Sequence, residues 1–194
     1  MKGCRPLTDT EIQGVLDSFK GENRLRNRCL VLLGIKAGFR ISELLSLRVR
    51  DVFQAGKVPD RVEVTRQHMK AQIESRSVVL HQMAKEAISE RIGELASRGQ
   101  GQPESYLFRS QRGGNAALGR IGGWCVLKKA YKTLSLTGRV SCHSLRKSFA
   151  SRVYDKLDHD LVKTQKALGH KNIQSTVAYL NFRQEDIDSA VLAI

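Results

Sequence analysis

His143 and Arg146 lie three residues apart, near the beginning of a predicted helix. This spacing puts both side chains on one face of the helix, where they could contact the same anion. Further along the chain, Tyr179 comes nine residues after His170, so a phenol and an imidazole could face one pocket. Taken alone, each pattern is more often structural, because such side chains are usually solvated or half-buried with satisfied polar atoms.

Arg40 stands shortly after an apolar segment that ends at Gly38. A guanidinium buried at such a place needs a fixed anionic partner. Glu43, three residues further on, could supply part of that partner. The alternative is a pairing of Arg40 with Glu43 on the surface, which holds for most pairs at this spacing.

Hydrophobic periodicity and end signals predict helices that would position these residues. Thr8 and Glu11 form a capping box at the start of the first helix. The second helix is apolar nearly all round and is therefore expected to be buried, with Gly38 as its C-cap. The predicted helices cover residues 8–20, 23–37, 41–47, 82–98, 118–134, 144–157, 160–168, 173–179 and about 184–192.

Two short segments have the character of strands. Residues 61–66 alternate between apolar and polar side chains, and residues 76–80 form a second short run, so together they predict an antiparallel hairpin. The connection 67–75 is long for a tight turn, which predicts a mobile, polar tip. Residues 106–108 could add another short strand. The sequence therefore predicts a mainly α fold with a small antiparallel β-sheet.

The chain is strongly basic: its 194 residues include 33 Lys and Arg against 19 Asp and Glu, a formal net charge of +14. Such an excess favours a polyanionic partner, and nucleic acid is the commonest one. A membrane surface is the rival, but these charges are spread along the chain rather than concentrated in one tail or helix. The longest apolar run, 29–35, is far shorter than the roughly 20 residues that cross a bilayer. With no apolar segment after Lys2 and Arg5 to form a secretory signal, a cytosolic protein is expected.

The usual signatures of metal and nucleotide sites are not expected here. The cysteines are far apart and are interpreted as reduced thiols rather than zinc ligands. The glycine-rich stretch 119–123 lacks the rest of a phosphate-binding loop and is interpreted as packing. Asp158, His159 and Asp160 could suggest a metal corner, but acidic residues at a helix boundary are more often N-caps. The four cysteines are Cys4, Cys29, Cys125 and Cys142.

Considered together, these motifs are much more specific than any one alone. In order, they are G-F-R-I-S-E-L from Gly38, H-S-L-R from His143, L-G-H ending at His170, and Tyr179. In this combination, from about Leu7 to at least Tyr179, the chain resembles the catalytic domain of the tyrosine recombinases, the phage integrase family. The resemblance implies that family's catalytic-domain fold and a site-specific recombinase that breaks and rejoins DNA.

The resemblance also implies a catalytic set of two arginines, a hairpin lysine, two histidines and a tyrosine. Lys70 is chosen by its distance from the strand 78–80, with Arg66 and Arg76 flanking it as the alternatives. Glu43 is a supporting residue. The tyrosine would form a 3′-phosphotyrosyl DNA intermediate without cofactor or metal. The positions that match the family's motif are Arg40, Lys70, His143, Arg146, His170 and Tyr179.

The family's usual partners complete the expectation. The resemblance implies double-stranded DNA as the partner and a homotetramer on the DNA synapse, with a monomer or weak oligomer in the absence of DNA. It also implies a cytoplasmic protein of a prokaryote, phage or mobile element. Residues 1–194 are expected to form one catalytic domain without the family's N-terminal core-binding domain. The tail helix in 180–194 could be exchanged between protomers. The alternative function is a DNA-binding or regulatory module that keeps the fold without productive recombination.

Overall fold

The computed structural model describes residues 3–67, 73–180, 188 and 191–193. These residues divide into two compact units, Met1–Phe149 and Ala150–Ile194. Most of the predicted functional residues fall in the first unit, whereas His170 and Tyr179 fall in the second.

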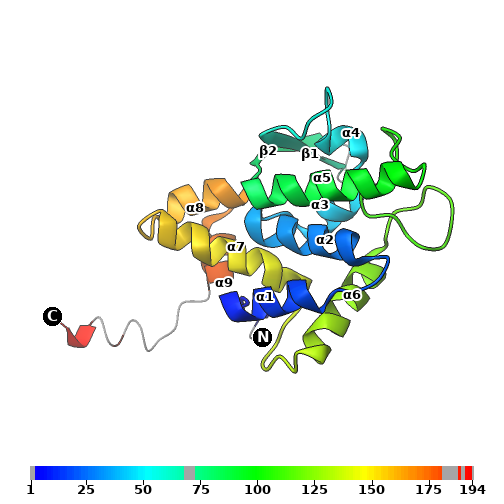
Figure 1. Ribbon diagram of the computed structural model, residues 1–194. Helices are drawn as coiled ribbons and strands as arrows, with labels where there is room; N and C mark the ends of the chain where they lie inside the picture. The colour runs from blue at the N-terminus through cyan, green and yellow to red at the C-terminus, as the bar shows by residue number, and fades with distance from the viewer. Residues whose placement is uncertain (1–2, 68–72, 181–187, 189–190, 194) are drawn as a thin grey trace. The chain divides into compact units, whose positions relative to one another are not determined.

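The first unit is mainly helical, with one two-stranded sheet among its described residues (Figure 1). This confirms the fold class that the sequence predicts. Its elements in chain order are α1 (Asp9–Ser18), α2 (Arg24–Lys36), α3 (Ile41–Ser46), α4 (Val49–Val52), β1 (Arg61–Gln67), β2 (Ile73–Val79), α5 (Gln82–Ser97) and α6 (Arg120–Thr133). Helix α7 (Cys142–Lys156) begins in this unit and ends in the second.

The core of the first unit is built around α2. Cys29, Leu30, Val31 and Leu33 are completely buried, as expected for a helix that is apolar nearly all round. Helix α2 packs against α5, which buries Ala84, Ile88 and Leu95 among others. Helix α1 begins with the predicted capping box. The sequence therefore predicts the central helices and their buried faces correctly.

The hairpin is longer and more regular than the sequence predicts. Its antiparallel register runs from Arg61 opposite Val79 to Gln67 opposite Ile73. The predicted connection 67–75 is therefore wrong, because Ile73–Ser75 already belong to β2. Backbone pairing continues there through a stretch with a single apolar residue, Ile73, which gives no alternation for a sequence pattern to detect. The tip 68–72, with Lys70, lies outside the described residues.

The segment between α5 and α6 differs from its prediction. Instead of a strand at 106–108, the structure has a single antiparallel bridge between Arg48 and Tyr106. Leu107 and Phe108 are fully buried, so their apolar character reflects core packing of an irregular segment rather than strand pairing. The short helix α4, whose first turn contains Asp51, was not predicted.

In the second unit, two short helices follow the end of α7: α8 (Leu161–Leu168) and α9 (Ile173–Leu180). Asp160 is the N-cap of α8, where its side chain accepts a hydrogen bond from the backbone N–H of Lys163 at 2.9 Å. This confirms the capping interpretation of Asp160. Helix α8 ends at Gly169, whose φ of 60° is left-handed. The predicted tail helix 184–192 lies mostly outside the described residues.

Within the described part of the chain, no helix combines the length and apolar character needed to cross a bilayer.

Candidate active site

Arg40 lies at the N-cap of α3 and is fixed there by Glu43. The backbone N–H of Arg40 donates to Glu43 Oε2 at 2.7 Å, and its guanidinium Nη1 donates to Glu43 Oε1 at 2.8 Å. The Glu43 side chain is only 2% exposed, whereas that of Arg40 is 21% exposed. This is not a surface ion pair, because a buried carboxylate orients a guanidinium that still reaches solvent.

Glu43 also binds an arginine from the hairpin. Arg76 of β2 donates from Nη2 to Glu43 Oε2 at 3.0 Å, and its guanidinium carbon lies 6.0 Å from the centre of the Phe39 ring. Burial opposes ionisation of Glu43, but the bonds from Arg76 and Arg40 outweigh it and lower the pKa of this carboxyl to about 2. Glu43 is therefore an anion throughout the physiological pH range.

Arg146 is held by the backbone just before α3. It is 1% exposed, and its Nη1 donates to the carbonyl oxygen of Gly38. Arg76 donates to the same oxygen at 3.4 Å. Gly38 has a left-handed φ of 65°, and a Cβ at this position would collide with the Phe149 ring. A glycine is thus needed where the backbone presents this carbonyl to two arginines.

His143 lies one turn of α7 before Arg146, and its side chain is exposed. Partial desolvation lowers the pKa of His143, and the positive charges of Arg146, Lys147 and Arg40 lower it further. These charges act on His143 because the two arginines lie near it. The imidazole is therefore neutral, and able to accept a proton, down to a lower pH than a free histidine.

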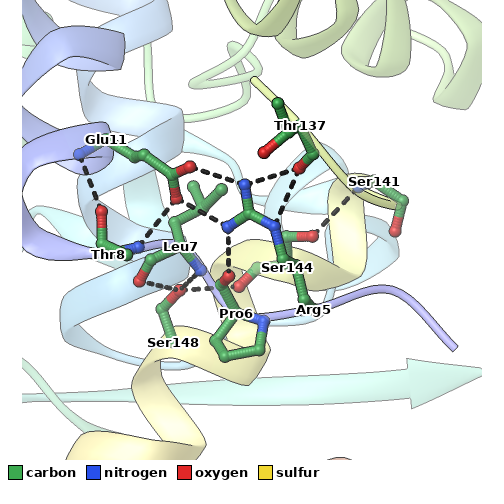
Figure 2. A network of polar contacts seen from close by, with 9 residues as sticks. All are labelled: Arg5, Pro6, Leu7, Thr8, Glu11, Thr137, Ser141, Ser144 and Ser148. Atoms are coloured by element: carbon green, nitrogen blue, oxygen red, sulfur yellow. Dashed lines mark hydrogen bonds and ion pairs between the residues drawn. The ribbon is translucent and has the colours of Figure 1, made fainter.

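The N-terminal segment fixes the beginning of α7 through a polar network (Figure 2). Arg5 donates to the carbonyl of Thr137 at 2.9 Å from Nε and pairs with Glu11 of α1. The backbone N–H of Leu7 donates to Ser148 Oγ at 2.8 Å. Because Ser148 lies on α7 with His143 and Arg146, this network holds the part of the helix that carries both side chains.

A cavity of about 1030 Å³ opens beside Arg40 and Glu43. Val64 of β1, Arg48 and Arg120 are among the residues that line it. A concave surface with several guanidinium groups is suited to contact the phosphates of a nucleic acid.

The second unit brings His170 and Tyr179 together. Their rings meet edge to face with centroids 5.0 Å apart. Thr176, which is completely buried on α9, places its Oγ1 3.0 Å from His170 Nδ1. Gln165 of α8 donates to the carbonyl of His170 at 3.0 Å. The two rings are therefore in contact, as their spacing suggested, and Thr176 and Gln165 both help to fix His170.

The structure places the predicted residues in two groups. Arg40, Glu43, His143 and Arg146 gather in the first unit, and His170 and Tyr179 gather in the second. Lys70 lies outside the described residues. Sequence reasoning missed the part that Arg76 plays here, since it considered Arg76 only as an alternative to Lys70. It also missed Thr176, although a spacing of three from Tyr179 was an available signal.

Comparison with known proteins shows the family to which the chain belongs. The profile of the phage integrase family matches residues 5–186. The chain therefore belongs to the phage integrase family. The tyrosine recombinase XerD of Corynebacterium glutamicum is 33% identical over 166 residues, which cover 84% of this chain and 50% of that protein. The chain spans about half of the length of the XerC and XerD relatives it matches.

Solved structures share the fold. The crystal structure of the XerA recombinase matches with a TM-score of 0.73 and 19% identity, over 97% of this chain and 65% of that one. The XerH site-specific recombinase in a post-cleavage complex with its palindromic difH substrate matches with a TM-score of 0.71 and 22% identity, over 96% and 52% of the two chains. These likenesses establish a tyrosine recombinase catalytic-domain fold.

Proposed function

We propose that this chain is the catalytic part of a site-specific DNA recombinase that cleaves and rejoins double-stranded DNA through a covalent tyrosyl intermediate. The observation that carries the proposal is the anchoring of Arg40 and Arg146 around one short segment, 38–43, beside His143. Two fixed guanidinium groups suit the non-bridging oxygens of a phosphodiester. Membership of the phage integrase family supports the same reaction.

In the proposed cleavage step, the Tyr179 oxygen attacks the scissile phosphorus. The bond from phosphorus to the 5′ oxygen breaks, and the DNA 3′ end becomes a phosphotyrosyl ester. Arg40 and Arg146 neutralise the charge that develops on the non-bridging oxygens. Attack by a DNA 5′ hydroxyl reverses these steps and rejoins the strand, so the energy of the broken bond is conserved.

Proton transfer falls to the remaining residues. His143 accepts the phenol proton of Tyr179, a role that its lowered pKa favours because the neutral imidazole persists. His170, with Nδ1 engaged by Thr176, offers Nε2 to a phosphate oxygen. We assign to Lys70 the proton that the departing 5′ oxygen needs. The rival function, a DNA-binding or regulatory module, requires none of these proton transfers.

The first test is the formation of an SDS-stable protein–DNA adduct on suicide duplexes tiled across the DNA that flanks the gene. We expect the wild-type chain to form such an adduct, and Tyr179→Phe to bind the same duplexes with unchanged affinity but form none. Tyr154→Phe, a change of the same size in the second unit, is the matched control and should still form the adduct. An adduct that persists in Tyr179→Phe would place the nucleophile elsewhere.

Lys70 has its own chemical test. Replacing the bridging 5′ oxygen with sulfur gives a leaving group that needs no proton. We expect Lys70→Ala to cleave the ordinary duplex poorly and the sulfur duplex nearly as well as the wild-type chain, whereas Arg146→Ala should cleave both poorly. Rescue of Arg66→Ala instead of Lys70→Ala would show that the wrong hairpin residue has been assigned.

Strand exchange joins two DNA sites, each cut on both strands, so we propose that four copies of the chain act together on DNA. The segment 180–194 is proposed to contact a neighbouring copy. A complex of four chains and two duplexes, measured by light scattering, is the expected assembly, with a monomer or weak oligomer in the absence of DNA. Because the proposed substrate is genomic or mobile-element DNA and the relatives are bacterial, we propose a cytoplasmic site of action.

A further inference from the structure

We propose that Arg76 is a positioning residue for Arg40, acting through the carboxylate of Glu43. This inference rests on the proposed function, in which Arg40 binds the scissile phosphate. It concerns a residue of the hairpin strand that none of the family's motifs in this chain includes.

The contacts form a continuous path. Arg76 of β2 donates to Glu43 Oε2 at 3.0 Å, the same oxygen that accepts the backbone N–H of Arg40. The other oxygen, Oε1, accepts from the guanidinium of Arg40 at 2.8 Å. The plane of one carboxylate is therefore set by a strand on one side and by Arg40 on the other. A carboxylate held at both oxygens cannot rotate without breaking one of these bonds.

The burial of these side chains increases the effect of losing one of the bonds. The side chains of Glu43 and Arg76 are 2% and 18% exposed, so water cannot readily replace a lost partner. Arg40 and Glu43 both line the cavity, and the Arg40 side chain, at 21% exposed, is the more accessible of the two. A displacement of Glu43 would thus also displace the Arg40 guanidinium from the place where a phosphate oxygen would bind.

Glu43 has two arginine partners, Arg40 and Arg76, which come from different elements. Arg40 belongs to the same helix start, Arg76 comes from β2, and Glu63, Arg48 and Arg120 line the cavity that Glu43 also borders. Among these groups, Arg76 contributes most to the lowered pKa of Glu43, ahead of Arg40. Removing Arg76 would leave the buried carboxylate held only from the side of Arg40, so that Glu43 and the guanidinium bound to it could move together.

A second contact ties Arg76 to the other arginine site. Arg76 also donates to the carbonyl oxygen of Gly38, the atom that accepts from Arg146. At 3.4 Å this bond is weak, so the effect of Arg76 should pass mainly through Glu43.

The experiment compares Arg76→Met, Arg76→Lys and the control Arg61→Met, which removes an exposed arginine from the other strand of the hairpin. Cleavage rates are measured at saturating DNA on three versions of the mapped suicide duplex. In the first the scissile phosphate is ordinary, in the second it is a neutral methylphosphonate, and in the third its bridging 5′ oxygen is sulfur. The methylphosphonate lacks the negative charge that Arg40 neutralises, so cleavage of this duplex should depend little on the orientation of Arg40.

We expect Arg76→Met to cleave the ordinary duplex about 10- to 100-fold more slowly, as for a misplaced catalytic group. DNA affinity should stay close to that of Arg61→Met, whereas the unfolding midpoint should fall, because Glu43 loses one of its charged partners; the rates are therefore compared at a temperature at which both variants are fully folded. The methylphosphonate should restore the rate, as it should for Arg40→Ala, and the sulfur duplex should not. Arg76→Lys should recover part of the rate. Restoration by sulfur alone would mean that Arg76 acts through the hairpin tip, and equal loss on all three duplexes would mean a purely structural role; either result overturns the proposal.

A measurement without DNA separates this inference from the proposed function. The pKa of Glu43, followed by carbon-13 NMR of its carboxyl carbon, should rise in Arg76→Met and stay low in Arg61→Met. An unchanged Glu43 titration would overturn the coupling. A wild-type chain that forms no covalent adduct would instead overturn the proposed function, whatever the titration shows.

Discussion

At the scale of single residues, burial distinguishes the tyrosines of the chain. Tyr131 is 4% exposed, donates to the carbonyl of Ser141 at 3.3 Å, and has its pKa raised chiefly by desolvation. Attack on phosphorus needs an accessible phenol that loses its proton readily, so Tyr131 is a poor nucleophile. Tyr179 is half-buried and lies against His170, which agrees with its proposed role.

Thr176 is predicted to set the orientation of His170. Thr176→Val keeps the shape of the side chain but removes the hydroxyl that contacts His170 Nδ1. We expect cleavage at saturating DNA to fall about tenfold, equivalent to about 1.4 kcal/mol in the barrier. The ring nitrogen-15 shifts of His170 should change as well. Thr176→Ser, which keeps the hydroxyl, is the control, and equal rates for the Val and Ser variants would contradict this role.

The spacing of the motif residues predicted three local pairs: Arg40 with Glu43, His143 with Arg146, and His170 with Tyr179. Arg40 contacts Glu43 because both lie at one helix start, and His170 meets Tyr179 because the short turn after α8 leads directly into α9. The bond between Arg76 and Glu43 joins residues 33 positions apart, which no local pattern reveals. Long-range contacts of this kind depend on how the hairpin packs against α3, and the sequence carries no direct record of that packing.

At the scale of elements, the turn between α2 and α3 fixes the positions of Arg40 and Arg146. Gly38 combines a left-handed φ with close approach to Phe149, and its carbonyl oxygen accepts from Arg146. The sequence predicted a glycine cap for α2. The second role, presenting a carbonyl to an arginine 108 residues away, required the structure.

Comparing Gly21→Ala with Gly38→Ala separates the cost of a left-handed backbone from the cost of a steric clash. Gly21 has a similar φ of 69° but open space around its Cα, whereas a Cβ at Gly38 would meet the Phe149 ring. Gly21→Ala should lower the free energy of unfolding by about 1–2 kcal/mol through the left-handed backbone alone. Gly38→Ala should lose about 1–3 kcal/mol more, the cost of overpacking. Urea unfolding measures both, and equal losses would mean that Phe149 moves aside freely.

Helices with a strong apolar period were predicted well, and short or irregular elements were not. Helix α2 has little apolar period because its centre is apolar nearly all round, but the length of the segment and the glycine that follows it still indicated a buried helix. The four-residue α4 is too short to show a period. The sequence suggested a strand at Leu107 and Phe108 because an apolar run alone does not distinguish a strand from a buried irregular segment.

At the scale of the whole molecule, the net charge indicates the kind of partner, and the length shows how much of its relatives the chain covers. A net charge of +14 on 194 residues favours a polyanionic partner, as the proposed reaction on DNA requires. The chain corresponds to about half of each XerC and XerD relative it matches. Membership of the phage integrase family rests on the match over residues 5–186.

The covalent link itself provides the most direct test of the central claim. A suicide duplex trapped by the wild-type chain is digested with nuclease and protease, and the modified peptide is sequenced by mass spectrometry. We expect a nucleotide joined through its 3′ phosphate to Tyr179. Attachment to any other residue, or through a 5′ phosphate, would contradict it.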